Sequence, residues 1–212
     1  RRQRQMCIRD RAQRTLGAAE GIHTYTDMHG NLIWRALAQP GTFTLGHDLL
    51  AEITRHPDPQ LHGLRKTPVE ELPDETIGYL LPSRYVDSDL VSAEAWDRFG
   101  HIQGGWAQVQ AISDYLYAEC TYGYGSTSTT TAKQAFDSRR AVCRDFAHMG
   151  VAFCRALNIP ARYVCGYMPD IDIVPDPVPM DFHAWFEVFL DGQWRTFDAR
   201  HNRPRICLLY TS

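Results

Sequence analysis

The chain has 212 residues, of which 44% are hydrophobic and 22% charged, and its formal net charge is −3. This length allows one complete domain and part of a second. A mildly acidic chain has no bulk attraction for nucleic acid or for an anionic membrane. No apolar run is long enough to span a bilayer. We therefore expect no nucleic-acid or membrane partner. A cytoplasmic location is the expectation; secretion and the oligomeric state stay open.

Both ends of the chain fit the translation of one short DNA element. Residues 6–10 read MCIRD and residues 207–212 read CLLYTS. One DNA sequence that encodes CLLYTS also encodes MCIRD when its opposite strand is read. This DNA element resembles a transposase end used in sequencing libraries. We predict that residues 1–11 and 207–212 are adapter-encoded tails. Native genomic DNA running through both ends would contradict this and favour the alternative, a basic arm that binds nucleic acid or membrane.

Without these tails, the native stretch has a net charge near −7, because five arginines and one aspartate are removed. Four cysteines stay: Cys120, Cys143, Cys154 and Cys165. They form no C-x-x-C pair, and their spacing matches no common zinc pattern. Four cysteines in a chain of this length do not indicate a disulfide scaffold, so we expect reduced thiols.

The first part of the chain is predicted to be rich in β-strands. GIHTYTD and LIWRALA flank a turn at residues 29–31, and the strands TFTL and LLAEITR follow. Alternating residues around a Gly-Asn turn favour antiparallel pairing. We interpret residues 12–56 as the remnant of an N-terminal β-rich domain. Residues 57–90 are rich in proline, histidine and charge at their start, and are predicted to be a linker with at most one short helix.

Helices are predicted in the middle of the chain. Ser92 is expected to cap a short helix that ends near Phe99. Residues 104–119 carry an apolar stripe with helical spacing, made of Trp106, Val109, Ile112, Leu116 and Tyr115. Thr131 and Gln134 have capping-box spacing. The last helix is predicted from Cys143 to Leu157, since Pro160 cannot continue it.

Three strands are predicted next, at residues 161–167, 183–190 and 193–200. The sequence Asp191-Gly192 is a strong signal for a two-residue hairpin. If Leu190 pairs with Gln193, then Asp198 lies opposite Trp185. Because side chains alternate between faces, His183 and Asp198 share one face as diagonal neighbours. An aspartate at this position can accept a hydrogen bond from a histidine ring and fix its tautomer.

Cys143 lies where the last helix begins. Backbone N–H groups at a helix start have no intrahelical partner, and the helix dipole favours negative charge there. Both effects stabilise a thiolate over a thiol, and the same N–H groups can donate to an oxyanion. A cysteine at a helix start beside a sheet that carries His and Asp is therefore a coherent acyl-transfer site.

Other residues compete for these roles. His148 lies about 140° around the helix from Cys143 and is interpreted as structural. Cys154, Cys165 and Cys120 are interpreted as buried apolar residues. Asp145 suits the helix dipole, and Arg144 is expected to be solvated. Each of Cys143, His183 and Asp198 also has an ordinary structural explanation when taken alone; their joint placement on a helix and a hairpin favours function.

These motifs resemble the core of the bacterial transglutaminase-like superfamily. The matching segments are AVCRDFAH, DFHAWFEV and TFDAR, and the likeness extends upstream through LPDETIGYLLPSRYVDSD. The segment DMHGNLIWRALAQPGTFTL is similar to the small β-rich domain that often precedes this core. The resemblance implies an α+β, papain-like fold with a core at residues 91–206. It also implies a triad of Cys143, His183 and Asp198. Val142 stands where the family often has glycine, and the chain stops shortly after Asp198.

The resemblance implies cysteine-nucleophile acyl transfer on peptide or carboxamide bonds, with hydrolysis favoured over transamidation. It implies a peptide or protein substrate and no metal or organic cofactor. One alternative is a non-catalytic module of the same fold that binds peptides. A second alternative is a metal site formed by His183, Asp198 and His201. Beyond the Cys143 backbone N–H, Trp106 and Tyr122 are only weak candidates for oxyanion donors.

Overall fold

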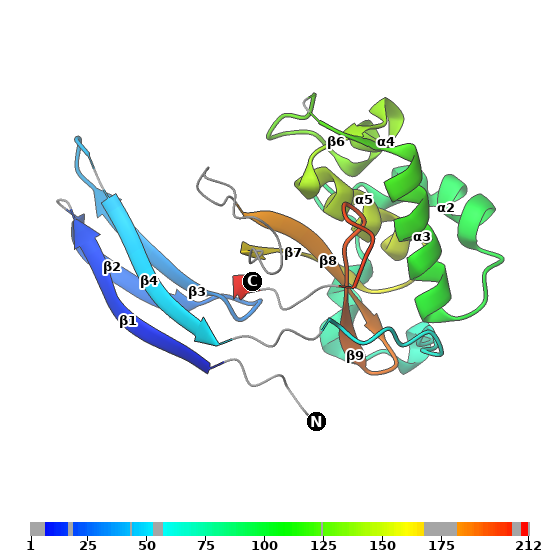
Figure 1. The fold of residues 1–212 in the computed structure, drawn as a ribbon, viewed down its shortest axis with the longest axis horizontal. Helices are drawn as coiled ribbons and strands as arrows, with labels where there is room; N and C mark the ends of the chain where they lie inside the picture. The colour runs from blue at the N-terminus through cyan, green and yellow to red at the C-terminus, as the bar shows by residue number, and fades with distance from the viewer. Residues whose placement is uncertain are drawn as a thin grey trace. The chain divides into compact units, whose positions relative to one another are not determined.

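The computed structural model describes residues 7–16, 19–42, 44–52, 57–123, 125–167, 182–204 and 209–211. The chain divides into two compact units, Arg1–Arg55 with Thr211–Ser212, and His56–Tyr210. Strands form the first unit, and helices packed on a sheet form the second (Figure 1). The second unit has the predicted α+β architecture.

The first unit contains two antiparallel strand pairs. Strand β1 (Cys7–Leu16) pairs with β4 (Thr44–Glu52), and β2 (Ala19–Thr26) pairs with β3 (Leu32–Ala38). The Asp27 carboxylate accepts the backbone N–H groups of the turn between β2 and β3, which confirms the predicted hairpin. Strand β4 is continuous where two strands were predicted; Phe43 and residues 53–56 lie outside the described part.

The stretch 57–90, predicted to be a linker, is more ordered than expected. It contains the short helices η1 (Val69–Glu71), α1 (Asp74–Ile77), η2 (Gly78–Leu80) and η3 (Ser88–Val91). The Leu64 carbonyl accepts the N–H groups of Gly105 at 3.0 Å and Trp106 at 3.1 Å. This stretch therefore packs as part of the second unit. Its proline and charge content did not reveal such long-range contacts.

Four longer helices follow: α2 (Ser92–Phe99), α3 (Gly105–Glu119), α4 (Ala132–Ser138) and α5 (Cys143–Ala156). The capping box of α4 is confirmed by reciprocal hydrogen bonds between Thr131 and Gln134. The predicted cap of α2 is wrong by one residue. Ser92 is the first helical residue, Val91 precedes it, and no side chain caps this helix.

The main sheet has the strand order β10-β7-β8-β9. Its members are β7 (Ala161–Tyr167), β8 (His183–Leu190), β9 (Gln193–Phe197) and β10 (Leu209–Thr211). A short parallel pair joins β5 (Thr121–Tyr122) to β6 (Arg140–Ala141).

The β8–β9 hairpin has the predicted register. Leu190 pairs with Gln193, and the turn residues Asp191 and Gly192 have φ of 49° and 79°. Positive φ at both positions is the geometry of a type I′ turn. The predicted end of β9 is wrong, because the strand stops at Phe197 and Asp198 opens a turn.

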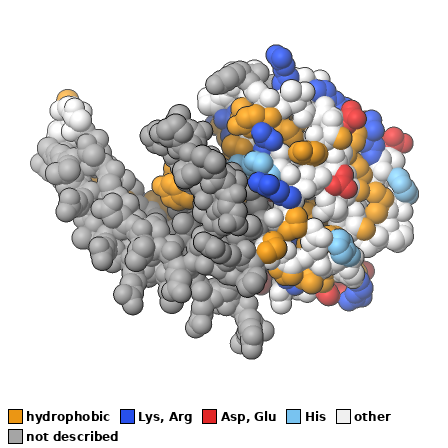
Figure 2. Space-filling view, viewed as in Figure 1, with side chains coloured by type: hydrophobic (Ala, Val, Ile, Leu, Met, Phe, Trp, Pro, Cys, Tyr) orange, Lys and Arg blue, Asp and Glu red, His pale blue; other side chains and the backbone are white. Residues whose placement is uncertain are grey.

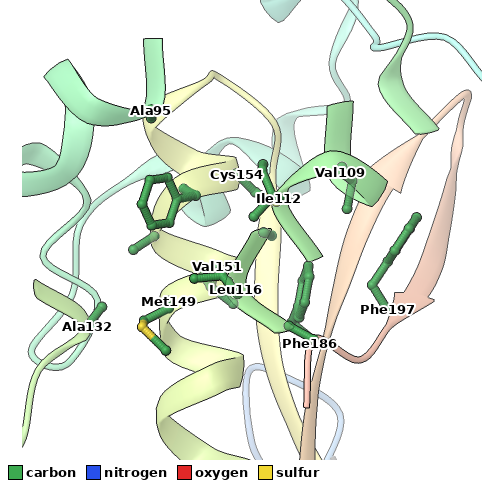
Figure 3. Close-up of a cluster of buried hydrophobic side chains, with 14 of the residues drawn as sticks. Ala95, Val109, Ile112, Leu116, Ala132, Met149, Val151, Cys154, Phe186 and Phe197 are labelled. Atoms are coloured by element: carbon green, nitrogen blue, oxygen red, sulfur yellow. The ribbon is translucent and has the colours of Figure 1, made fainter. Parts of the chain in front are cut away.

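Helix α5 lies at the centre of the second unit. It contacts β7 and β8 and also α2, α3 and α4 (Figure 1). Gly150 allows the close approach to β8, since a Cβ there would lie 2.5 Å from the Phe186 ring. Around this contact, Val109, Ile112 and Leu116 of the predicted α3 stripe are buried with side chains from α5 and the sheet (Figure 3). This core fixes the first turn of α5 against the sheet.

The visible surface of the second unit mixes apolar, basic and acidic side chains without a large patch of one charge (Figure 2). Among the described residues, no helix has the length and apolar character needed to cross a membrane. The cellular location stays a prediction.

Candidate active site

The structure joins His183 and Asp198 directly. His183 Nε2 lies 2.7 Å from Asp198 Oδ2, and both side chains are buried. An ionised carboxylate only accepts, so Nε2–H is the donor, and in the neutral ring Nδ1 is the nitrogen that carries no hydrogen. The predicted proximity is confirmed even though β9 ends one residue before Asp198. The turn at Asp198 brings its carboxylate to the first residue of β8.

The two oxygens of Asp198 have different partners. Oδ1 accepts the backbone N–H of Arg200 at 2.8 Å and of His201 at 3.2 Å. Oδ2 faces the rings of His183 and His201, whose Nδ1 lies 3.3 Å away. The backbone therefore fixes the carboxylate while Oδ2 orients the His183 ring.

Cys143 is the first residue of α5 and is half-buried. The N–H of Val142, just before it, is bound by the Asp145 carboxylate at 2.9 Å. Valine has no side-chain acceptor, so Asp145 alone caps this helix start. Asp145 is thus a structural cap as well as a favourable charge for the dipole.

The turn after β9 contacts β5, the strand that pairs with β6 just before Cys143. The Arg200 guanidinium lies 3.9 Å from the centre of the Tyr122 ring. Tyr122 pairs with Ala141 in the β5–β6 ladder, two residues before Cys143. Tyr122 therefore has a clear role in linking these segments, whereas its role as an oxyanion donor stays a prediction.

Arg144 is not simply solvated, as the sequence suggested. Its guanidinium donates to Ser126 Oγ at 2.6 Å, to the Thr127 carbonyl at 2.7 Å and to Asp145 Oδ1 at 3.0 Å. These bonds hold the loop before α4 beside the start of α5. Ser126 and Thr127 lie 18 and 17 residues before Arg144, so local spacing gave no signal for these two contacts.

His148 is placed away from any acid–base role. Its ring stacks on Tyr85, with centroids 5.7 Å apart, and lies tilted against Tyr163, with centroids 5.0 Å apart. Burial is the main cause that lowers the pKa of His148 to about 4. A neutral, buried ring agrees with the structural role predicted for it.

All four predicted native cysteines are reduced, as expected. Burial raises the pKa of Cys154, which has no exposed surface, and that of Cys120. Burial also raises the pKa of the Tyr163 phenol, with smaller contributions from the thiols of Cys165 and Cys143. Cys143 and Cys165 are the half-buried pair, and only Cys143 begins a helix.

A cavity of about 110 Å³ lies beside Asp198. Trp106 and Ser113 line it, and among the described residues no hydrogen-bond partner reaches Trp106 Nε1 or Ser113 Oγ. The residues that line the cavity include Asp198 but not Cys143. The oxyanion role predicted for Trp106 therefore stays a prediction.

The sequence matches the transglutaminase-like superfamily over residues 95–199. A crystal structure of a provisionally assigned cysteine protease from Cytophaga hutchinsonii is 33% identical to the chain with a TM-score of 0.80. The similarity covers 100% of this chain and 72% of that one. The chain belongs to the transglutaminase-like superfamily.

Two further comparisons concern the fold and the share of a relative that this chain covers. The periplasmic domain of TgpA from Pseudomonas aeruginosa, bound to ethylmercury, is 19% identical over 93% of this chain and 71% of that one. Its TM-score of 0.55 supports the fold alone. An uncharacterized Mycobacterium leprae protein is 34% identical over 118 residues, or 54% of this chain and 42% of the relative. The chain thus spans less than half the length of this curated relative.

Within the superfamily core, the three motif residues lie at three element boundaries. Cys143 begins α5, His183 begins β8, and Asp198 follows β9. Residues at element ends project from a packed scaffold without interrupting its hydrogen bonds. The superfamily is thus established for this chain, and the Cytophaga structure is described as that of a cysteine protease.

Proposed function

We propose that this protein is a cysteine acyl-transfer enzyme that cleaves peptide or carboxamide bonds through a thioester on Cys143. The observation that carries the proposal is the buried 2.7 Å hydrogen bond between His183 and Asp198. The position of Cys143, half-buried at the start of α5, also supports the proposal. Cys143 is the nucleophile, His183 is the base, and Asp198 orients the base.

The proposed reaction begins with a proton transfer from the Cys143 thiol to His183 Nδ1. The thiolate attacks the carbonyl carbon, and backbone N–H groups at the start of α5 stabilise the oxyanion. The C–N bond then breaks as Nδ1–H protonates the leaving amine, which leaves a thioester. Water, deprotonated by His183, hydrolyses the thioester to a carboxylic acid and restores the thiol. Asp198 stabilises the imidazolium at each proton transfer.

Hydrolysis is favoured over transamidation by analogy with the Cytophaga neighbour, which is assigned as a protease. An amine that replaces water in the last step gives a transamidase with the same residues. The choice between water and an amine as acceptor is therefore a separate prediction from the nucleophile.

Alkylation of the four thiols tests the assignment of Cys143. Iodoacetamide at neutral pH, followed by mass mapping, should modify Cys143 at least about 10-fold faster than Cys165, because only a thiolate reacts. Cys165 is the matched control, since it is also half-buried but lies within a strand. Cys165→Ala should leave the fast phase intact, and Cys143→Ala should remove it.

Equal rates at Cys143 and Cys165 would contradict the enzyme and favour the non-catalytic peptide-binding module. If Cys143 is the fast thiol, incubation with a peptide library and a fluorescent primary amine compares the two acceptors. New carboxyl termini or released ammonia without amine label are expected. Amine-labelled peptides as the main product would instead establish transamidation.

A further inference from the structure

A second arrangement of groups overlaps the proposed acyl-transfer site. His183 Nε2, Asp198 Oδ2 and His201 Nδ1 offer one ligand atom each, and all three lie within 4.8 Å of one another. Two imidazole nitrogens and one carboxylate oxygen are a common ligand set for divalent transition ions. The ligands come from the start of β8 and the turn after β9.

The separations are close enough for one shared ion after small movements of the three side chains. Oδ2 lies 2.7 Å from the His183 nitrogen and 3.3 Å from the His201 nitrogen. Ligands at about 2.1 Å from one zinc ion are themselves separated by roughly 3.0–3.4 Å. The largest separation requires a modest rotation of the half-buried His201 ring. Oδ1 keeps its two backbone hydrogen bonds, so the carboxylate stays oriented when Oδ2 binds the ion.

We propose that this trio is an inhibitory site for a divalent ion of the zinc class. The ion binds His183 Nε2 in place of the proton that Nε2 shares with Asp198, and Nδ1 takes the proton of the Cys143 thiol. Metal binding therefore releases one proton to solvent and leaves a thiolate beside a metal-bound neutral imidazole. The inhibitory consequence rests on the proposed function, whereas binding itself does not.

The ion acts on the proton-transfer step and leaves the nucleophile in place. A metal-bound neutral imidazole holds its remaining N–H more firmly than an imidazolium does, so it is a poor acid for the leaving amine. The nearby positive charge still favours the Cys143 thiolate. Amide turnover should therefore stop while alkylation of Cys143 continues.

Cobalt is the probe for the site, because its visible spectrum reports its ligands. Titration of the chain, free of affinity tags, should give one bound Co²⁺ with d–d bands and no thiolate-to-cobalt charge-transfer band. A charge-transfer band that is lost in Cys143→Ala would place the ion on the thiolate and overturn the proposal. Absence of stoichiometric binding would overturn it as well.

His201→Phe is the decisive variant, since it removes one ligand and keeps an aromatic ring beside His183, 4.9 Å away in the parent chain. Loss of an outer-shell partner alone costs about 10–100-fold in metal affinity, so loss of a ligand should cost at least about 10-fold. His101→Phe, which changes an exposed histidine, is the matched control and should bind Co²⁺ normally. Equal affinity in both variants would overturn the site.

Zinc then tests the consequence in the same chain. Amide turnover should fall with zinc occupancy in the parent chain and resist zinc in His201→Phe, each compared with its own metal-free rate. Cys143 alkylation should continue in zinc-loaded parent chain; protection would contradict the mechanism. If metal-free Cys143 is unreactive but Co²⁺ binds, the proposed function fails and the metal site stands.

Discussion

At the scale of single residues, Asp198 connects the local backbone with the chemistry of the site. Its Oδ1 accepts two backbone N–H groups, and its Oδ2 accepts from the His183 ring. An asparagine side chain has only one oxygen. That oxygen can accept the backbone N–H groups of the turn, but it cannot also accept from the His183 ring. The negative charge that stabilises an imidazolium is lost in every orientation of the amide.

The substitution Asp198→Asn should therefore lower amide turnover by roughly 10²–10⁴-fold while the chain stays folded. The rate of Cys143 alkylation should fall too, because the thiolate–imidazolium pair loses its support. Turnover, alkylation and thermal unfolding are measured on the same preparation. Asp137→Asn, at an exposed position of α4, is the control. Unchanged turnover in Asp198→Asn would remove Asp198 from the mechanism.

His148 gives a prediction about stability. Burial lowers its pKa to about 4 from the value near 6.5 that an unfolded chain has. Between pH 4 and pH 6.5, the His148 ring is protonated in the unfolded chain but neutral in the folded chain. The contribution of the neutral His148 ring to the free energy of unfolding is therefore fully present above pH 6.5. It is lost as the pH drops towards 4, by at most about 3 kcal/mol.

His148→Phe should reduce this acid sensitivity, because phenylalanine keeps the ring contacts with Tyr85 and Tyr163 and has no proton to gain. Denaturant unfolding at several pH values between 4 and 7 measures the slope. His101→Phe should leave the slope as it is. The same acid sensitivity in His148→Phe would show that other groups cause it, and loss of Cys143 reactivity would contradict the structural role of His148.

At the scale of elements, the β8–β9 hairpin explains how much of the site the sequence could predict. Asp191-Gly192 dictated the turn, the turn dictated the register, and the register placed His183 near Asp198. The end of β9 was not predictable in this way. It depends on the turn that Asp198 forms with its own carbonyl and carboxylate, not on strand propensity.

The turn itself can be tested at Gly192. Its φ of 79° lies in the left-handed region, and no atom stands within 4 Å of the position of a Cβ. Gly192→Ala should therefore cost about 1–2 kcal/mol of unfolding free energy through the backbone alone. Gly63→Ala, equally open but without positive φ, is the matched control and should change stability little. Equal effects of both substitutions would show that the turn conformation adds no specific cost.

Other parts of the site depend on contacts that cannot be predicted from a local sequence pattern. Arg144 reaches Ser126 and Thr127, and Arg200 stacks on Tyr122, across stretches of loop. Such pairs join residues far apart in sequence, so spacing and periodicity cannot find them. The helix stripe of α3 and the capping box of α4 were predictable because each is a local pattern with a fixed period or spacing.

At the scale of the whole molecule, the main hydrophobic core and the proposed site belong to one unit. Every buried residue of that core, from Val86 to Ala199, lies within His56–Tyr210. So do Cys143, His183 and Asp198. A compact unit with its own core has the basic requirement for independent folding.

A fragment of residues 56–210 should therefore unfold in a single cooperative thermal transition. Its Cys143 should be alkylated at a rate within about threefold of the full chain, because the three proposed catalytic residues and the core that holds them lie within the fragment. Far-UV circular dichroism and mass mapping of the alkylated thiols measure both properties, with the full chain as the reference. If the fragment is unfolded, or if Cys143 reacts no faster than Cys165 in the fragment alone, the strands of residues 1–55 are required to form the site. The second unit would then be a dependent half of one folding domain.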